Sequence, residues 1–314
     1  MRHWLTHAVV LASVIGLFHA TFGQFKAAAQ GGAMPLADLH FHALQNVSPQ
    51  DALKEMDRAG VRWASSGARG MDNFWLPYVQ AAPNRFAPFA GQGPIAIIVR
   101  NQGEAAWKLT NPVIHQYLKV LEENLKSGRF HGIGEIIINN LDSKAGQPGA
   151  HYPADSPLVR RLLALAATYQ VPLSFHVQAD PDSLQEMERL LAQDPTVAII
   201  WCHAGSFASV RQVAQVMERY PNFYADLAGR DDRRRSPRVK TESIVGEQRR
   251  LKADWKALLE ARSDRFFVGT DMPGDMSEYQ ARIRFFRDVL AQLSPAAAKR
   301  IGYDNAQRLL RLVQ

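Results

Sequence analysis

The sequence predicts an α/β protein whose single domain is a (β/α)8 barrel of the TIM type, and three observations predict it. Eight short apolar runs of strand-like composition follow one another between residues 36 and 271. Amphipathic stretches with helical spacing lie between them, and near-continuous apolar strands bounded by helices are typical of a parallel sheet buried on both faces. Histidine and acidic side chains stand near the ends of several runs, which is where barrel enzymes place their sites.

The expected strands are residues 36–41, 61–65, 86–90, 132–138, 171–176, 197–203, 223–226 and 265–271. The second and third are the weakest, and the apolar run at residues 95–99 competes with residues 86–90 for the third place. Two helices stand out, at residues 158–169 and 183–192, because leucines recur there at helical spacing. An open, doubly wound sheet is the alternative fold, but no glycine-rich phosphate loop follows any of the strands.

The amino-terminal residues 1–29 are predicted to be a secretory signal peptide, which leaves residues 30–314 as the barrel domain. Arg2 supplies a positive start, and an apolar run follows at residues 8–18. That run is shorter than the about 20 residues that span a bilayer comfortably. The three alanines at residues 27–29 offer a cleavage site, although cleavage a few residues earlier and an uncleaved anchor stay open. The expected location is outside the cytoplasm, periplasmic or secreted, with no stable membrane insertion after cleavage.

Composition limits the function classes further. The 314 residues include 37 Lys+Arg and 30 Asp+Glu, a formal charge of +7 that is too dispersed to predict nucleic-acid binding. Cys202 is the single cysteine, so an internal disulfide and a cysteine-rich zinc site are both excluded. Any metal must therefore be held by histidines and carboxylates. The composition predicts no particular oligomeric state.

Six candidate metal ligands occur at or near strand ends: His40, His42, Glu135, His176, His203 and Asp271. His40 and His42 are two positions apart, so an extended strand would turn both to the same side. A single strand histidine is more often an ordinary core or surface residue. Several such groups at one end of a barrel are costly to bury unless a cation compensates them. Imidazole with carboxylate suits zinc, so the sequence predicts one or two divalent ions, with zinc preferred.

These residues occur in an ordered set of motifs: Asp-x-His-x-His, Gly-x-Gly-Glu-Ile, a histidine ending strand five, a histidine ending strand six, and Gly-Thr-Asp-x-Pro. The set resembles the amidohydrolase superfamily. Within it, the sequence is most similar to the amidohydrolase-2 group, metal-dependent hydrolases that include aminocarboxymuconate semialdehyde decarboxylase-like enzymes. The Asn305-Ala306 pair also resembles the start of that group's closing helix. The resemblance covers roughly residues 36–312.

The resemblance implies a first metal ion bound by His40, His42, His176 and Asp271. It further implies that Asp271 takes a proton from the attacking water. His203 would stabilise charge that develops on the substrate, or bind a second ion. Glu135 would bridge two ions, as in two-metal relatives such as the TatD-type nucleases, or support a one-metal site.

The implied activity is hydrolysis of an ester, lactone, amide or similar bond in a small molecule by a metal-activated water. The alternative is metal-dependent, non-oxidative decarboxylation of a carboxylated small molecule. A barrel that only binds a ligand, and a nuclease, are less favoured alternatives. Residues 230–240 carry six basic and two acidic side chains, most of which are expected to be solvated. Arg230 is nearest the strand end, and it is predicted to bind an anionic substrate.

Overall fold

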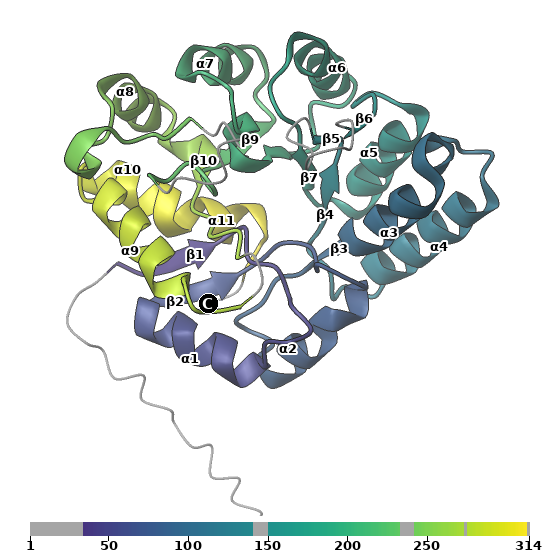
Figure 1. The fold of residues 1–314 in the computed structure, drawn as a ribbon, viewed down its shortest axis with the longest axis horizontal. Helices are drawn as coiled ribbons and strands as arrows, with labels where there is room; N and C mark the ends of the chain where they lie inside the picture. The colour runs from purple at the N-terminus through teal and green to yellow at the C-terminus, as the bar shows by residue number, and fades with distance from the viewer. Residues whose placement is uncertain (1–33, 141–149, 233–241, 273–274, 313–314) are drawn as a thin grey trace, which may run out of the picture. The chain divides into compact units, whose positions relative to one another are not determined.

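Eight parallel strands form the barrel in residues 34–140, 150–232, 242–272 and 275–312, the part of the chain that the computed structural model describes (Figure 1). They are β1 (Leu36–Asp38), β2 (Val61–Ala64), β3 (Phe89–Gly91), β4 (Gly132–Ile137), β7 (Leu173–His176), β8 (Ile199–Trp201), β9 (Phe223–Asp226) and β10 (Phe266–Phe267). The predicted (β/α)8 barrel is thereby confirmed. The expected signal peptide lies outside the described residues.

The strands pair as one ladder from β3 through β4, β7, β8 and β9 to β10, with β1 and β2 as a separate pair. Backbone hydrogen bonds join the two pieces on both sides. The amide of Phe89 donates to the carbonyl of Ser66 over 2.9 Å, and the amide of Leu39 donates to the carbonyl of Val268, also over 2.9 Å. These bonds link β2 to β3 and β10 to β1, so the sheet closes on itself.

Most helices lie on the outside of this ring in Figure 1, and the last one packs across an end of the barrel. The helices are α1 (Pro49–Ala59), α2 (Leu76–Ala81), α3 (Gln92–Gln102), α4 (Pro112–Lys126), α5 (Pro157–Tyr169), α6 (Pro181–Leu191), α7 (Val210–Arg219), α8 (Ala253–Ala261), α9 (Tyr279–Leu290), α10 (Pro295–Lys299) and α11 (Asn305–Leu309). Several begin in the same way, with a capping side chain followed by proline: Ser48 before α1, Asn111 before α4, Ser156 before α5 and Asp180 before α6. The cap accepts a backbone N–H that the helix leaves unpaired, and proline needs no such partner at the first position.

The two clearest helix predictions are confirmed as α5 and α6, and the choice for the third strand is settled. Phe89–Gly91 is the strand, and residues 95–99 lie in α3. A short antiparallel pair, β5 (Asn139–Asn140) with β6 (Ala150–His151), follows β4.

The amino-terminal end of the barrel is filled by a buried apolar cluster. Side chains from the strands, such as Ala37, Phe89 and Phe267, pack there against Ala306 and Leu310 in and beside α11. The polar strand ends at the other end of the barrel are therefore the part that is left for a ligand. No described helix has the length and apolar character needed to cross a membrane.

Candidate metal centre

The six candidate ligands predicted from the sequence lie together at the carboxyl ends of the barrel strands. Glu135 is on β4, and His176 is the last residue of β7. The other four stand in the turns that follow strands: His40 and His42 after β1, His203 after β8 and Asp271 after β10. The expectation that His203 and Asp271 end their strands is wrong, because β8 ends at Trp201 and β10 at Phe267.

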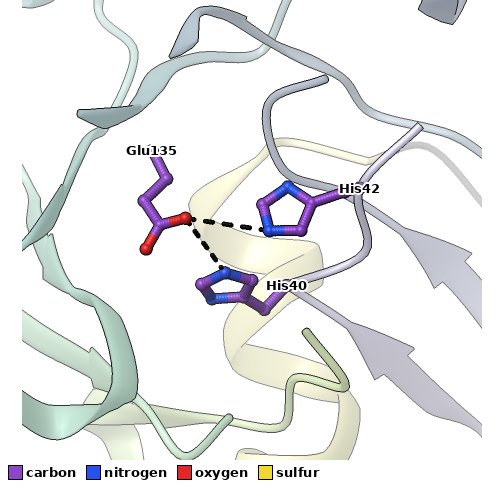
Figure 2. A group of neighbouring side chains, drawn as sticks. All are labelled: His40, His42 and Glu135. Carbon is purple, nitrogen blue, oxygen red and sulfur yellow. Dashed lines mark ion pairs between the residues drawn. The ribbon is translucent and has the colours of Figure 1, made fainter. Parts of the chain in front are cut away.

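The imidazoles of His40 and His42 converge on one carboxylate oxygen (Figure 2). The Nε2 atoms of His40 and His42 lie 3.4 and 3.7 Å from Oε2 of Glu135. Asp271 Oδ1 lies 3.4 Å from Nε2 of His42 and 3.9 Å from Nε2 of His40. Both Nε2 atoms are buried and have no hydrogen-bond partner among the described residues. Two buried nitrogens without hydrogen bonds, facing two carboxylates, leave a place for a cation.

The second oxygen of Glu135 faces the other two histidines. Its Oε1 lies 2.9 Å from Nδ1 of His176 and 3.3 Å from Nε2 of His203. Donor atoms of His40, His42 and Glu135 all lie within 4.8 Å of one another, and so do those of Glu135, His176 and His203. Glu135 therefore belongs to two groups of potential ligands, one for each of its oxygens.

Hydrogen bonds at the opposite ring nitrogens orient three of these histidines. Each Nδ1 lies 2.9 to 3.0 Å from an acceptor, which is the carboxylate of Asp226 for His40, the carbonyl of Gly67 for His42 and the carbonyl of Ala228 for His203. Because a carbonyl or an ionised carboxylate oxygen can only accept, Nδ1 carries a proton, and in the neutral imidazole Nε2 presents its lone pair to the centre of the site. Metal-binding histidines are held in this way.

The charges of the centre compensate one another. Burial alone would raise the pKa of Glu135, but His40, His176 and His203 hold it well below its usual range. Burial likewise opposes ionisation of Asp271, yet the neighbouring His42 and nearby positive groups, Arg69 among them, hold its pKa well below the usual value. Burial lowers the pKa of His42 and favours its neutral form. Ionised carboxylates beside a neutral imidazole are the states in which these groups bind a divalent cation.

His40 differs from His42 in its electrostatic environment. Burial alone would lower the pKa of His40, but the carboxylates of Asp226 and Glu135 outweigh it and raise that pKa well above the usual value. Positive charge is thus favoured at the point where His40 faces Glu135. A bound cation would supply the same charge, so the residues fit a divalent metal ion.

A cavity of about 480 Å³ opens over the centre and adds residues that sequence reasoning missed. The guanidinium of Arg69 donates a hydrogen bond to Oδ1 of Asp271, and Nε2 of Gln92 donates to Oε2 of Glu135 over 3.3 Å. Arg100 also lines the cavity. These side chains follow β2 and β3, the two weakest strand predictions. Their position just after the end of a strand was the one sequence signal that could have identified them as cavity residues.

Comparison with known families identifies the chain. A family model named Amidohydro_2 and described as amidohydrolase matches residues 18–312. The chain belongs to the amidohydrolase-2 family. This family is metal-dependent, in agreement with the ligand set. No curated protein matches the sequence of this amidohydrolase.

Solved structures similar to this amidohydrolase show the same fold. An uncharacterised TIM-barrel protein from Bordetella bronchiseptica has a TM-score of 0.58 and 17% identity, over 84% of this chain and 82% of its own. The 2,6-dihydroxybenzoate decarboxylase from Rhizobium, solved alone and with 2,6-dihydroxybenzoate, has a TM-score of 0.53 and 17% identity, over 89% and 99%. A dihydroxybenzoic acid decarboxylase from a Polaromonas species, with bound manganese and 2-nitroresorcinol, gives 0.53 and 16%, over 89% and 98%.

Two buried arginines hold the turns that carry His203 and Asp271. Both of these residues have left-handed backbones, with φ of 58° and 46°. Nε of Arg230 donates to the carbonyl of His203 over 2.8 Å, and Nη1 of Arg282 donates to the carbonyl of Asp271 over 2.6 Å. Close packing also fixes the second turn, since a Cβ on Gly269 would lie 2.5 Å from Cβ of His40.

The prediction that Arg230 binds an anionic substrate is wrong. Its side chain is fully buried, and it donates to the carbonyls of His203, Ala204, Ala208 and Glu242. Its guanidinium also lies over the ring of Trp255, 5.1 Å from the centroid. Burial lowers the pKa of Arg230 to about 10, so it remains charged at neutral pH. The turn after β8 is irregular, so its backbone carbonyls need hydrogen-bond donors from a side chain. No sequence pattern indicates that Arg230 supplies them. Residues 233–240 of the basic run lie outside the described part.

The variant Arg230→Ala is therefore expected to lose stability rather than affinity for anions. It removes four hydrogen bonds from a buried charged donor, and we expect the free energy of unfolding to fall by about 3 kcal/mol or more. Urea denaturation measures the change. Arg211→Ala, at an exposed position on α7, is the matched control. Equal unfolding midpoints for the two variants would contradict the structural role.

The variant Asp226→Asn is expected to weaken metal binding by about 10- to 100-fold through His40. The oxygen of the new amide can still accept from the backbone amides of His203 and Ala228, as Oδ1 of Asp226 does. Its nitrogen then faces Nδ1 of His40 and donates to it, which moves the imidazole proton to Nε2. Competition with a chelator measures the affinity. An affinity equal to that of the unaltered protein would show that Asp226 does not control the His40 tautomer.

Proposed function

We propose that this amidohydrolase is a metal-dependent hydrolase that cleaves an ester, lactone, amide or similar bond of a small molecule. One observation carries the proposal: the buried Nε2 atoms of His40 and His42 lack hydrogen-bond partners among the described residues and face the carboxylates of Glu135 and Asp271. The chemistry that a divalent cation supplies when bound there is a water with a pKa of about 7 and a polarised substrate oxygen.

Zinc is the proposed ion, because imidazole and carboxylate ligands suit it, and manganese in the Polaromonas decarboxylase is the rival. His40, His42 and Asp271 would hold one ion. His176 and His203 would hold a second, with Glu135 shared between the two. The distances favour His176 beside His203 and Glu135, whereas the family resemblance alone assigns it to the first ion.

Asp271 is the proposed proton acceptor. Its carboxylate is ionised, lines the cavity and can accept a proton from the attacking water, then pass it to the leaving group. Arg69 donates to one of its oxygens and so orients it. Nε2 of His203 is directed into the same cavity, where it can either stabilise negative charge that develops on the substrate or bind the second ion.

The test is elemental analysis of the purified protein, which counts metal per chain, followed by assays on a panel of small esters, lactones and amides. A ratio near two supports Glu135 and His203 as ligands, and a ratio near one leaves them in supporting roles. Protein that takes up neither zinc nor manganese, or that is inactive on every substrate after loading, would argue against the proposal.

Non-oxidative decarboxylation is the second candidate, favoured by two observations. The similar structures from Rhizobium and Polaromonas are dihydroxybenzoate decarboxylases, and the cavity carries two cationic side chains, Arg69 and Arg100, that suit a carboxylated substrate. Release of carbon dioxide on turnover would support decarboxylation, whereas appearance of a new carboxylic acid would support hydrolysis.

We also propose that the chain is exported, on the basis of the positive start, the short apolar run and the alanines in its first 29 residues. Amino-terminal sequencing of the protein recovered from cell fractions tests this. A mature protein that begins between about residue 20 and residue 30 in a periplasmic or extracellular fraction supports export. An intact Met1 in the cytoplasm would contradict it.

A further inference from the structure

An apolar groove lies beside the catalytic cavity, between α3 and α4. These helices are neighbours in Figure 1. The groove has a volume of about 240 Å³, and its walls include Met71, Pro94, Ile97, Val113 and Val120. Buried side chains of α4, Tyr117 and Leu121, lie at the same groove. The spacing of residues 113, 117 and 120 places them along one side of α4.

The groove collects most of the large hydrophobic side chains that are exposed in the described chain. These exposed side chains are Met71, Ile97, Val113, Val120 and Ile137, each 38 to 48% exposed. The first four line the groove, and the fifth lines the catalytic cavity. Scattered apolar side chains are ordinary on a surface, but a set gathered in one depression indicates a binding site.

The groove and the catalytic cavity adjoin each other. Ile97 lines both of them, and the neighbouring residues Gly70 and Met71 line one each. The cavity side offers Arg69 and Arg100 beside the candidate metal ligands, whereas the groove side is almost entirely apolar. A ligand that spans both parts needs a polar head for the cavity and an apolar tail for the groove.

We propose that the substrate is an aliphatic acyl compound whose chain lies in the groove between α3 and α4 while its carbonyl group lies at the metal centre. This inference rests on the proposed hydrolase function and names its substrate class. Hydrolysis of such an ester, amide or lactone adds water across the acyl bond and leaves a carboxylate with the same chain. Linear carboxylates are therefore analogues of the product.

The test is calorimetric binding of butanoate and octanoate to the purified full chain. A fully buried methylene contributes about fourfold in affinity, and a half-buried one about twofold. Octanoate, with four more methylenes, is therefore expected to bind about tenfold tighter than butanoate or better. A ratio near one would overturn the proposal, and since binding needs no turnover, this failure is distinct from a failure to bind metal or hydrolyse esters.

Two variants locate the chain. Val113→Asn and Val120→Asn each place an amide in the groove at an exposed position, and each is expected to bring the octanoate-to-butanoate ratio down by at least about threefold. Lys119→Asn puts the same side chain on α4 outside the groove and is expected to keep the ratio. If both valine variants keep the full ratio, the chain lies elsewhere. If light scattering finds a dimer that Val113→Asn and Val120→Asn dissociate, the groove is an interface between copies, and the proposal fails.

Discussion

The variant Asp271→Asn is expected to lose about two to four orders of magnitude in kcat, the usual contribution of a positioned acid–base group. The amide cannot accept the proton of the attacking water. Substrate contacts elsewhere in the cavity remain, so KM should change far less than kcat, the pattern of a group that acts in the transition state. Steady-state kinetics with a small ester or lactone measure both parameters.

Asp271 is also a proposed metal ligand, so metal content must be measured on the same sample. Asp275→Asn, at an exposed position near the same turn, is the matched control and should behave as the unaltered protein. Full activity of Asp271→Asn with metal bound would show that another group accepts the proton. A loss of activity that excess metal restores would assign Asp271 to metal binding alone.

The barrel and the ligand set could be predicted because both leave regular marks in the sequence. Parallel strands that are buried on both faces appear in the sequence as short apolar runs. All strands of a barrel end on the same side, so the residues that follow them mark the end of the barrel that binds ligands. His40, Glu135 and His176 could thus be grouped across more than one hundred residues without knowledge of any distance. Their order also carried the family resemblance, which the match over residues 18–312 confirms.

What the sequence could not show depends on backbone groups. The irregular turn after β8, where His203 and Ala204 both have positive φ, decides the role of Arg230. It places backbone carbonyls, rather than a substrate, within reach of the guanidinium. Strand alternation gives no account of such a turn. The tautomer of His42 is likewise set by the carbonyl of Gly67, which no side-chain pattern reveals.

The third strand shows a different limit. Short apolar runs are ambiguous between a strand and a buried helix segment, and residues 95–99 had the more apolar composition. In the structure the third strand is Phe89–Gly91. It pairs with β4, and the amide of Phe89 donates to the carbonyl of Ser66, which follows β2. Because the second and third strands were the weakest predictions, the cavity residues that follow them, Arg69 and Gln92, were not recognised.

The variant Glu135→Gln is expected to weaken metal binding by more than the roughly 10- to 100-fold that loss of an outer hydrogen-bond partner costs. One oxygen of Glu135 faces His40 and His42, and the other faces His176 and His203. The amide removes the negative charge that both groups share. Its NH2 group also turns a donor toward one of the two pairs of imidazoles, whose lone pairs are needed for a cation. Metal per chain should fall, and turnover should fall with it.

Glu186→Gln provides a close control for that experiment, because Glu186 is also a buried carboxylate beside a histidine. Its Oε2 lies 3.1 Å from Nε2 of His151 and accepts from the amide of Ala154, away from the metal centre. Both variants replace a buried glutamate by its isostere, so a general loss of stability should affect them alike. Only Glu135→Gln is expected to lose metal in a chelator titration. Equal metal affinities in the two variants would mean that Glu135 neither bridges nor supports the ions, and the two-group arrangement around it would have to be abandoned.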